Sequence, residues 1–571
     1  MANDTKHLPL ATAVARPTLL TGAEALAVSA AAAPAATIVG ACLIDRIGLP
    51  FPPLLLFAAF LLGGAGAFRA VRACIDWHLD ELMLWFAIVG AIFIWLLWIA
   101  SPSLLPLGSG SDLTHHLLLI QLIETHWRLA HDPGVERFLG EMTNYTPGSH
   151  ILAAASGAWS GTRGLNALYP VLAATVALKS GFIFLIARRA MGTKMDRIAQ
   201  LAFACVAVAM MFASKVYFLR SFVENSFVAQ VAGELFAVVM WWSLFVWDTG
   251  LAGAMIFGAA GVATFLTWPV WIGPPVVAAA VLALTQTAKP LGERASRLLL
   301  ACGPLAAIGV LYFAASPGGV AMAGTSGAAP WPQVSAYGRW FVTLSGVGLV
   351  IAATRREYSV VTIFAGAVLL QSAVLYFVAG GPGAEAPYLA LKMFYLLLYP
   401  QAVAAALAIA EAWRAVVVPL RWRRGTQSAL VLLMASAIIV AVSWPLRRAP
   451  RSLTTLKHPS ISAPLEQAGQ WARAHVPPAC VEYLVDLDET AYWLHLAVLG
   501  NPRLTTRSLD PDTYKPGMAI ARWLTPGGLT YGIADFATLP RGVREELDVL
   551  QQFDTAAVVK RRGVSSCPPE Q

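Results

Sequence analysis

The chain has 571 residues, of which 57% are hydrophobic and only 13% are charged. That charge content is about half of what soluble domains carry, so a protein built only of soluble domains is excluded. The formal net charge of +8 does not indicate nucleic-acid binding, because Lys and Arg are concentrated in short segments between apolar blocks.

Apolar blocks recur from residue 25 to residue 442. At about 15 to 22 residues, each is long enough to cross a hydrocarbon core of about 30 Å as a helix. The sequence therefore predicts a polytopic α-helical membrane protein with about 13 transmembrane helices. The predicted helices cover residues 25–43, 51–68, 82–100, 165–187, 198–218, 230–247, 251–266, 270–285, 298–315, 340–353, 360–379, 391–412 and 429–442.

Basic residues mark alternate loops, which the positive-inside rule assigns to the cytoplasm. These loops contain residues 69–72, 188–197, 289–297, 355–356 and 414–424. The opposite face then receives the long loop 101–149, the segment around Arg220, the Gly-rich loop 316–338 and everything after Pro445. A channel or carrier usually has its working residues near the membrane midplane, so this asymmetry favours chemistry on the outer face.

The expected organisation has two domains. Residues 1–446 would form a multi-pass domain in the cell (inner or plasma) membrane, with loop 101–149 as part of it. Residues 447–571 would form a small extracytoplasmic α/β domain.

The first outer loop contains an expected helix at residues 111–132, because apolar residues recur there at helical spacing. They are Leu113, Leu117, Ile120 and Ile123. We expect this amphipathic helix to lie along the membrane surface. Asp112 opens it, with His115 and His116 on the same face. Asp112 is either a general base assisted by the histidines or a helix-capping residue that complements the helix dipole.

A second segment of the same loop contains Tyr145, Pro147, Gly148 and His150. The apolar stretch 151–159 that follows is too short to span the bilayer, so we expect it to re-enter or to lie flat.

An acidic residue opening a surface helix beside histidine, then Tyr-x-Pro-Gly-x-His in the first large outer loop, resembles the GT-C superfamily of polytopic membrane glycosyltransferases. The matching positions are Asp112, His115 or His116, Tyr145, Pro147 and His150. The resemblance loosely covers the whole chain. It implies polyprenyl-phosphate-linked sugars as donors and Asp112 as the catalytic acidic residue.

The superfamily often has two adjacent acidic residues where this chain has Ser111 and Asp112. The resemblance therefore makes no cofactor certain and leaves a divalent cation open. No zinc site is predicted, since the histidines of the loop do not form the spaced pair typical of zinc-binding helices. These histidines are His115, His116, His126 and His131.

Cations expected on the outer face depart from the positive-inside trend and are candidates for phosphate binding. They are Lys215, Arg220, Arg339 and Lys392. Lys392 shares one helix face with Tyr388, Tyr395 and Tyr399, so an ammonium and hydroxyls could hold a phosphate there. The alternative is a snorkelling lysine among interface tyrosines.

Glu224 is a further candidate in the second outer loop, where it could hold an acceptor or form a pair with Arg220. Trp268 is interpreted as an interface marker. Lys179 lies inside a predicted span, close enough to the cytoplasmic face to snorkel, and is left outside the site.

The tail alternates helix and strand patterns. Helices are predicted at residues 463–474, 489–499 and 541–552, and strands at 481–487, 529–533 and 555–560. Cys480 and Cys567 would form a disulfide if the tail is oxidised, or else stay as two thiols. The tail has no phosphate-binding loop, so we interpret it as acceptor-binding or structural.

The predicted function is sugar transfer from a polyprenyl-phosphate-sugar donor to a hydroxyl of a glycan, lipid or protein on the extracytoplasmic face, with inversion. Such an enzyme would serve the biosynthesis of a cell-envelope polysaccharide. Two alternatives stay open: a transporter or flippase of a lipid-linked glycan, and an assembly protein whose tail binds wall polymers.

Overall fold

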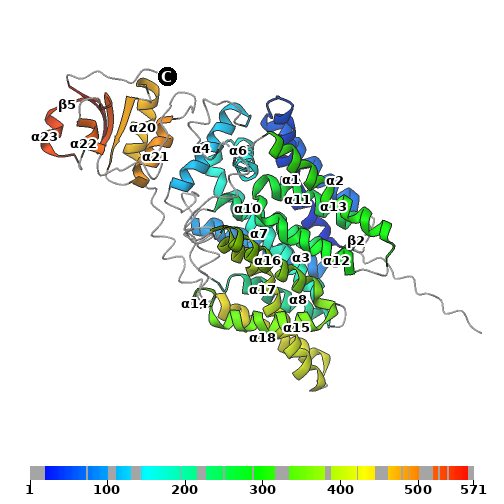
Figure 1. Cartoon of the computed structure of the whole chain (residues 1–571). Coiled ribbons are helices and arrows are strands. Elements are labelled where there is room, and N and C mark those ends of the chain that lie inside the picture. Colours follow the sequence, from blue (N-terminus) through cyan, green and yellow to red (C-terminus); the bar gives the residue numbers. More distant parts are fainter. Residues whose placement is uncertain are drawn as a thin grey trace, which may run out of the picture.

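The computed structural model describes residues 20–72, 75–100, 111–129, 142, 145–192, 195–214, 227–247, 251–285, 289–315, 334–379, 388–420, 422–443, 461–477, 480–485, 488–499, 519–524, 528–536 and 539–562. Figure 1 shows a large bundle of helices with a smaller unit of strands and short helices at one end. The chain is thus an α-helical polytopic membrane protein with a small α/β unit near its C-terminus.

The bundle is built from long helices that follow each other along the chain. They are α1 (Gly22–Arg46), α2 (Pro53–Val71), α3 (Leu79–Ala100), α7 (Gly164–Met191), α8 (Arg197–Met211), α10 (Val228–Phe245), α11 (Leu251–Thr267), α12 (Gly273–Thr285), α13 (Leu291–Ala315), α15 (Arg339–Thr354), α16 (Ser359–Ala379), α17 (Tyr388–Val416) and α18 (Arg424–Ser443).

Short elements connect or flank these helices. They are β1 (Leu20–Thr21), β2 (Ile75–Asp76), α4 (Ser111–His126), α6 (Gly148–Ser160), η4 (Pro269–Ile272), α14 (Val334–Tyr337), η6 (Arg356–Tyr358) and η7 (Val418–Leu420).

Each predicted apolar span coincides with a helix of the bundle. Within the described residues, nine helices are long and apolar enough to cross a membrane. The other predicted spans correspond to shorter apolar helices at Arg197–Met211, Leu251–Thr267, Pro269–Thr285 and Arg339–Thr354. The polytopic class is confirmed, and the total of about 13 crossings stays a prediction.

One end of the bundle is held by ion pairs between segments far apart in the sequence. Glu24, in the first turn of α1, accepts a hydrogen bond from Arg188 at 3.0 Å. Asp80, at the start of α3, accepts two bonds from Arg197 at 2.6 and 2.7 Å. The basic loop that the positive-inside rule assigns to the cytoplasm therefore joins the beginnings of α1 and α3.

The helices α4 and α6 lie at the end of the bundle beside the α/β unit (Figure 1). The apolar positions predicted for α4 are buried, including Leu113 and Ile120. Leu118 and Leu122 are buried too, because α4 contacts α6 and α7 of the bundle and also α21 of the tail. The prediction of a helix is confirmed. The expected position of this helix along the membrane surface is not confirmed, because α21 of the tail covers another face of α4.

The tail contains one four-stranded sheet in the order β3-β4-β6-β5. Strands β3 (Val481–Leu484) and β4 (Tyr531–Asp535) are parallel, and β6 (Ala556–Arg561) is antiparallel to β4 and to β5 (Leu547–Phe553). Its helices are α20 (Ala463–His475), α21 (Asp488–Leu499), α22 (Ala519–Leu524) and α23 (Arg541–Glu545).

The helix predicted at residues 541–552 is wrong over its second half. Only α23 is helical, and residues from Leu547 onward form strand β5. The local sequence of Leu, Gln and Asp residues gave a helical pattern. In the structure, the backbone of β5 instead forms its hydrogen bonds with β6. The two strands are joined by a hairpin turn in which Asp554 has a φ of 50°. Tertiary pairing thus overrides local propensity.

Cys480, just before β3, is buried and forms a disulfide. Cys567 lies outside the described residues, so the pairing of these two cysteines stays a prediction.

Candidate active site

The segment before α6 crosses the end of α11 at close range. The hydroxyl of Thr146 donates a hydrogen bond to the carbonyl oxygen of Thr267 at 2.7 Å. A Cβ atom on Gly148 would collide with the Thr267 side chain and lie 2.9 Å from the carbonyl oxygen of Leu266. The glycine of the Tyr-x-Pro-Gly-x-His segment is therefore required because the two backbones nearly touch.

Two histidines from different helices form a buried pair. Nδ1 of His116, on α4, lies 2.8 Å from Nε2 of His150, on α6. The two side chains are 2% and 0% exposed, and their rings are stacked with centroids 5.0 Å apart. One ring must donate and the other accept, so the pair shares a hydrogen.

Burial holds the pKa of His150 well below its ordinary value, and the nearby charge of His116 acts in the same direction. A hydrogen bond with the backbone of Pro147 acts in the opposite direction and is the weakest of the three effects. His150 is consequently neutral at physiological pH.

Tyr145 links the histidine pair to an indole ring. Its ring centroid lies 5.2 Å from that of His116 and 5.8 Å from that of His150. The ring centroid of Trp268, at the end of α11, lies 6.1 Å from that of Tyr145. A Cβ atom on Gly233 of α10 would lie 2.8 Å from Cβ of Trp268, so α10 also approaches this tryptophan closely.

Lys392, on α17, places a cation in the same cluster. Its Nζ lies 3.9 Å from the ring centroid of Phe227, 4.2 Å from that of Tyr388 and 4.9 Å from that of Trp268. The lysine is only 3% exposed. An ammonium held among three rings is stabilised by cation–π attraction and is partly stripped of water.

We call the assembly of His116, Tyr145, His150, Trp268, Tyr388 and Lys392 the aromatic cluster. It combines four sequence segments: α4, the start of α6 with the residues just before it, the end of α11, and the start of α17. Phe227 and Tyr395 lie at its edge, since the Phe227 ring lies 3.9 Å from Nζ of Lys392 and the Tyr395 ring lies 5.9 Å from that of Phe227.

A second polar group lies deeper in the bundle, in contact with the helices that support the aromatic cluster. The ammonium of Lys179, on α7, forms a buried ion pair with Glu234 of α10. The Tyr399 hydroxyl, on α17, donates a hydrogen bond to the same carboxylate. Lys179 is 1% exposed, so it does not snorkel as expected but pairs inside the bundle.

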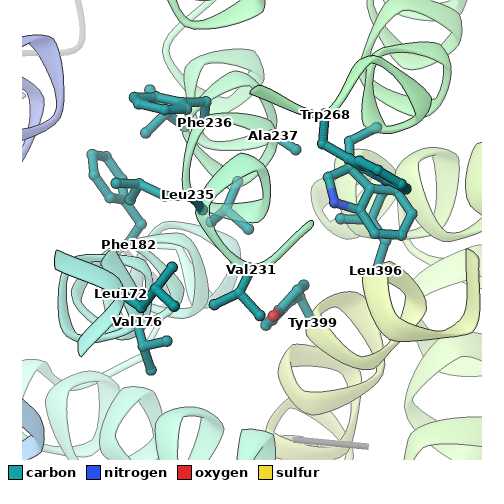
Figure 2. Packing of buried hydrophobic residues seen from close by; sticks show 14 of the residues in the cluster. Leu172, Val176, Phe182, Val231, Leu235, Phe236, Ala237, Trp268, Leu396 and Tyr399 are labelled. Atoms are coloured by element: carbon teal, nitrogen blue, oxygen red, sulfur yellow. The ribbon is translucent and has the colours of Figure 1, made fainter. Parts of the chain in front are cut away.

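The lysine–glutamate–tyrosine group joins α7, α10 and α17. Figure 2 shows Tyr399 of α17 beside Val231 of α10. It also shows Trp268 beside Leu396, which precedes Tyr399 by one turn of α17. The Trp271 indole donates a hydrogen bond to the carbonyl oxygen of Gln230 at 3.2 Å. The loop that carries Trp268 is thereby fixed to α10.

Several predicted site residues lie elsewhere or outside the described residues. Asp112 and His115 belong to α4, but their side chains lie outside the described part of the chain. Lys215, Arg220 and Glu224 lie outside it altogether. Arg339 is exposed at the start of α15, and no described contact joins its side chain to the aromatic cluster.

Sequence reasoning underestimated Trp268 and missed Phe227 and Glu234. Trp268 had one usable signal, because Pro269 follows it and ends α11 at that point. Phe227 had none, whereas Glu234 had one: it is an acidic residue inside the predicted span 230–247, where a charged side chain needs a partner.

Among the described residues, no group of three or more His, Cys, Asp or Glu side chains could hold a metal ion. The histidine pair is a hydrogen-bonded contact between two ring nitrogens. A two-nitrogen site of this kind lacks the ligand number that structural zinc requires.

No protein-family model and no curated protein matches this chain. Among solved structures, the chain is similar to the crystal structure of ArnT from Cupriavidus metallidurans in the apo state, with 12% sequence identity and a TM-score of 0.47. The similarity covers 83% of this chain and 97% of that chain. At this identity and TM-score, the activity of ArnT is not carried over to this chain.

Proposed function

We propose that the protein is a membrane glycosyltransferase that transfers a sugar from a polyprenyl-phosphate-sugar donor to an acceptor hydroxyl. The observation that carries the proposal is the aromatic cluster, in which the Tyr-x-Pro-Gly-x-His segment meets Lys392. Tyr145 and Lys392 both approach Trp268. The centroid of the Trp268 ring lies 6.1 Å from that of Tyr145 and 4.9 Å from Nζ of Lys392. If these residues served only as helix caps and interface markers, nothing in those roles would require the segments to meet at one place.

Lys392 is the proposed binding group for the donor phosphate. A buried ammonium flanked by aromatic rings attracts an anion strongly, since little water screens it. The Tyr388 ring lies 4.2 Å from the same nitrogen, and its hydroxyl is a group of the kind that donates to a phosphate oxygen. Lys215 and Arg220 are further candidates from the sequence.

Asp112 is the proposed general base. It precedes His116 by four residues on α4, one helical turn, and therefore lies on the same helix face. Its carboxylate would take the proton of the acceptor hydroxyl, whose oxygen forms a bond to the anomeric carbon. The bond from that carbon to the phosphate oxygen breaks, and polyprenyl phosphate leaves with both electrons.

The geometry of such a displacement inverts the anomeric configuration, because the acceptor attacks opposite to the leaving phosphate. The phosphate is a weak base and needs no general acid, so a cation that stabilises its charge is sufficient. The histidine pair would hold α4 against α6, which keeps residue 112 in register with the reacting sugar.

The proposed location is the outer face of the cell membrane, with the tail extracytoplasmic. The disulfide at Cys480 supports this orientation, because disulfides persist in oxidising compartments. The basic residues in the loops assigned to the cytoplasm support it as well.

Sugar transfer by the purified protein in nanodiscs tests the proposal. A panel of polyprenyl-phosphate sugars would be offered with glycan and lipid acceptors, and both released polyprenyl phosphate and glycosylated product would be measured. The enzyme yields both in equal amounts. A flippase would move the labelled lipid between leaflets of a vesicle and release no polyprenyl phosphate, which would overturn the proposal.

A further inference from the structure

A polar cavity lies between the bundle and the tail, with a volume of about 680 Å³. The turn between α6 and α7 forms one wall, and α20 and α21 of the tail form the other. The polar and aromatic residues among its described lining are Arg163, Asn166, Glu466, Gln470, Arg473 and Trp493. The cavity is therefore built from both parts of the chain.

This cavity is separate from the aromatic cluster. His150 lies at the start of α6, whereas Arg163 follows its end, and about 15 Å of helix separates His150 from Ser160. On α4, likewise, His116 lies near the start, while Glu124 near the end accepts a hydrogen bond from the Gly164 backbone. A ligand in the cavity would not touch the reacting sugar.

Two arginines make the cavity positive. Within the described part of the chain, neither Arg163 nor Arg473 forms an ion pair with an acidic side chain. Partial burial lowers the pKa of Arg473, and the charge of Arg163 lowers it further, so the two guanidinium groups repel each other. Arg163 also acts electrostatically on Glu124, whose carboxylate is already bonded to the Gly164 backbone.

The other lining residues add neutral binding groups. Arg163 is the N-cap of α7, a helix of 28 residues, so the positive end of its dipole adds to the two charges. Gln470 donates a hydrogen bond to Glu466 at 3.1 Å, which partly satisfies the one carboxylate in the described lining. Trp493, which is buried, adds an aromatic side chain to the cavity lining.

We propose that this cavity binds the anionic group, a phosphate or a carboxylate, of an acidic saccharide. It would hold an acceptor chain at a distance from the reacting hydroxyl, and this acceptor role rests on the proposed glycosyl transfer. Guanidinium groups suit both anions, because their planar fork forms paired hydrogen bonds to phosphate and carboxylate oxygens.

Calorimetric titration of the full-length protein in neutral detergent tests the proposal, with glucose 6-phosphate, glucuronate and glucose as probes. We expect the two acidic sugars to bind and glucose to bind much more weakly. Arg163→Gln and Arg473→Gln should each weaken binding about tenfold, the loss of one charge-assisted contact. Arg541→Gln, which removes the same charge elsewhere on the tail, should bind as the wild type does.

The thermal unfolding temperature of each variant shows that the fold is kept, since both arginines are exposed. Equal binding by wild type and both cavity variants, or no binding of either acidic sugar, would overturn the proposal. A loss of binding in Arg541→Gln equal to that in the cavity variants would also overturn the proposal.

A final experiment repeats the titration in nanodiscs of phosphatidylglycerol and of phosphatidylcholine. Loss of acidic-sugar binding only in phosphatidylglycerol would overturn the saccharide in favour of a lipid headgroup.

These titrations contain no donor, so they are independent of sugar transfer. Failure of transfer with intact binding would count against the proposed function alone. Failure of binding with intact transfer would count against the cavity alone.

Discussion

The ammonium nitrogen of Lys392 lies 4.9 Å from the centre of the Trp268 ring. Tyr145 packs near the same indole, with ring centroids 6.1 Å apart. One tryptophan at the end of α11 therefore joins the histidine pair to the cation on α17. The proposed chemistry depends on this junction, because base and phosphate-binding group must act on the same sugar.

Replacing Lys392 by Met should lower kcat/KM for sugar transfer by about 100-fold or more, since the departing phosphate loses its stabilising charge. Initial rates over a range of donor concentrations measure the effect. Lys289→Met is the matched control, because Lys289 pairs with Glu293 at 3.6 Å in a connection between helices. Wild-type rates in Lys392→Met would contradict the role of Lys392.

Gly148→Ala should destabilise the protein by about 1–3 kcal/mol, because the new methyl group overlaps Thr267 and overpacks the crossing of α6 and α11. Transfer should fall as well, since His150 lies on the displaced turn. Thermal unfolding in detergent and transfer rate measure the two effects. Gly90→Ala is the control, as no atom lies within 4 Å of its added Cβ. An equal response of the two variants would count against the close crossing.

The pKa of His150 is lower in the folded protein than its ordinary value of 6.5. Between these two pKa values the unfolded chain binds more protons, so stability rises with pH. The contribution of His150 is fully present above about pH 6.5 and is lost as the pH falls through the folded pKa. His150→Gln should reduce the acid-side fall of the unfolding temperature between about pH 7 and pH 5.

The matched control for this pH dependence is His78→Gln, since His78 lies at the other end of the bundle and pairs with Asp76 at 3.0 Å. It should keep the acid-side fall of the wild-type profile, because it leaves the buried His150 imidazole in place. An unchanged profile in His150→Gln would mean that this imidazole is not buried as described.

Glu234→Gln should destabilise the protein by about 3–5 kcal/mol, because it leaves the Lys179 ammonium buried without its counter-ion. The double variant Lys179→Met with Glu234→Gln should recover much of that loss, since no uncompensated charge remains. Tyr399→Phe should cost about 1.5–3 kcal/mol, the value of one hydrogen bond to a charged group. Unfolding temperatures of the set measure these effects, and a double variant no better than Glu234→Gln would argue against the pair.

The helical bundle was largely predictable, because each span is a long apolar block whose burial in lipid dominates its free energy. Local patterns also gave α20, β3, α21 and β6. They failed at β5, where helix-favouring residues pair with β6 instead. They also failed to show that α21 covers α4, since a tail that packs back onto the bundle leaves no local signal.

The candidate site was predictable in its parts and not in its assembly. His116, Tyr145, His150, Tyr388 and Lys392 follow from motif and helix face. Their junction through Trp268 depends on the fold, because α11 must end at the start of α6. The sequence also did not identify the partner of Lys179. The free-energy cost of burying a lysine predicts that a partner exists but does not single out Glu234.

The most direct measurement is sugar transfer by purified Asp112→Asn beside the wild type, with the donor that the wild type accepts. The Asn variant keeps the side-chain size and a helix-capping oxygen but cannot take a proton. Ser111→Ala serves as the control for helix capping. We predict transfer by the wild type and by Ser111→Ala, and a loss of about 100-fold or more in Asp112→Asn with unchanged thermal unfolding. Full transfer by Asp112→Asn would contradict the account.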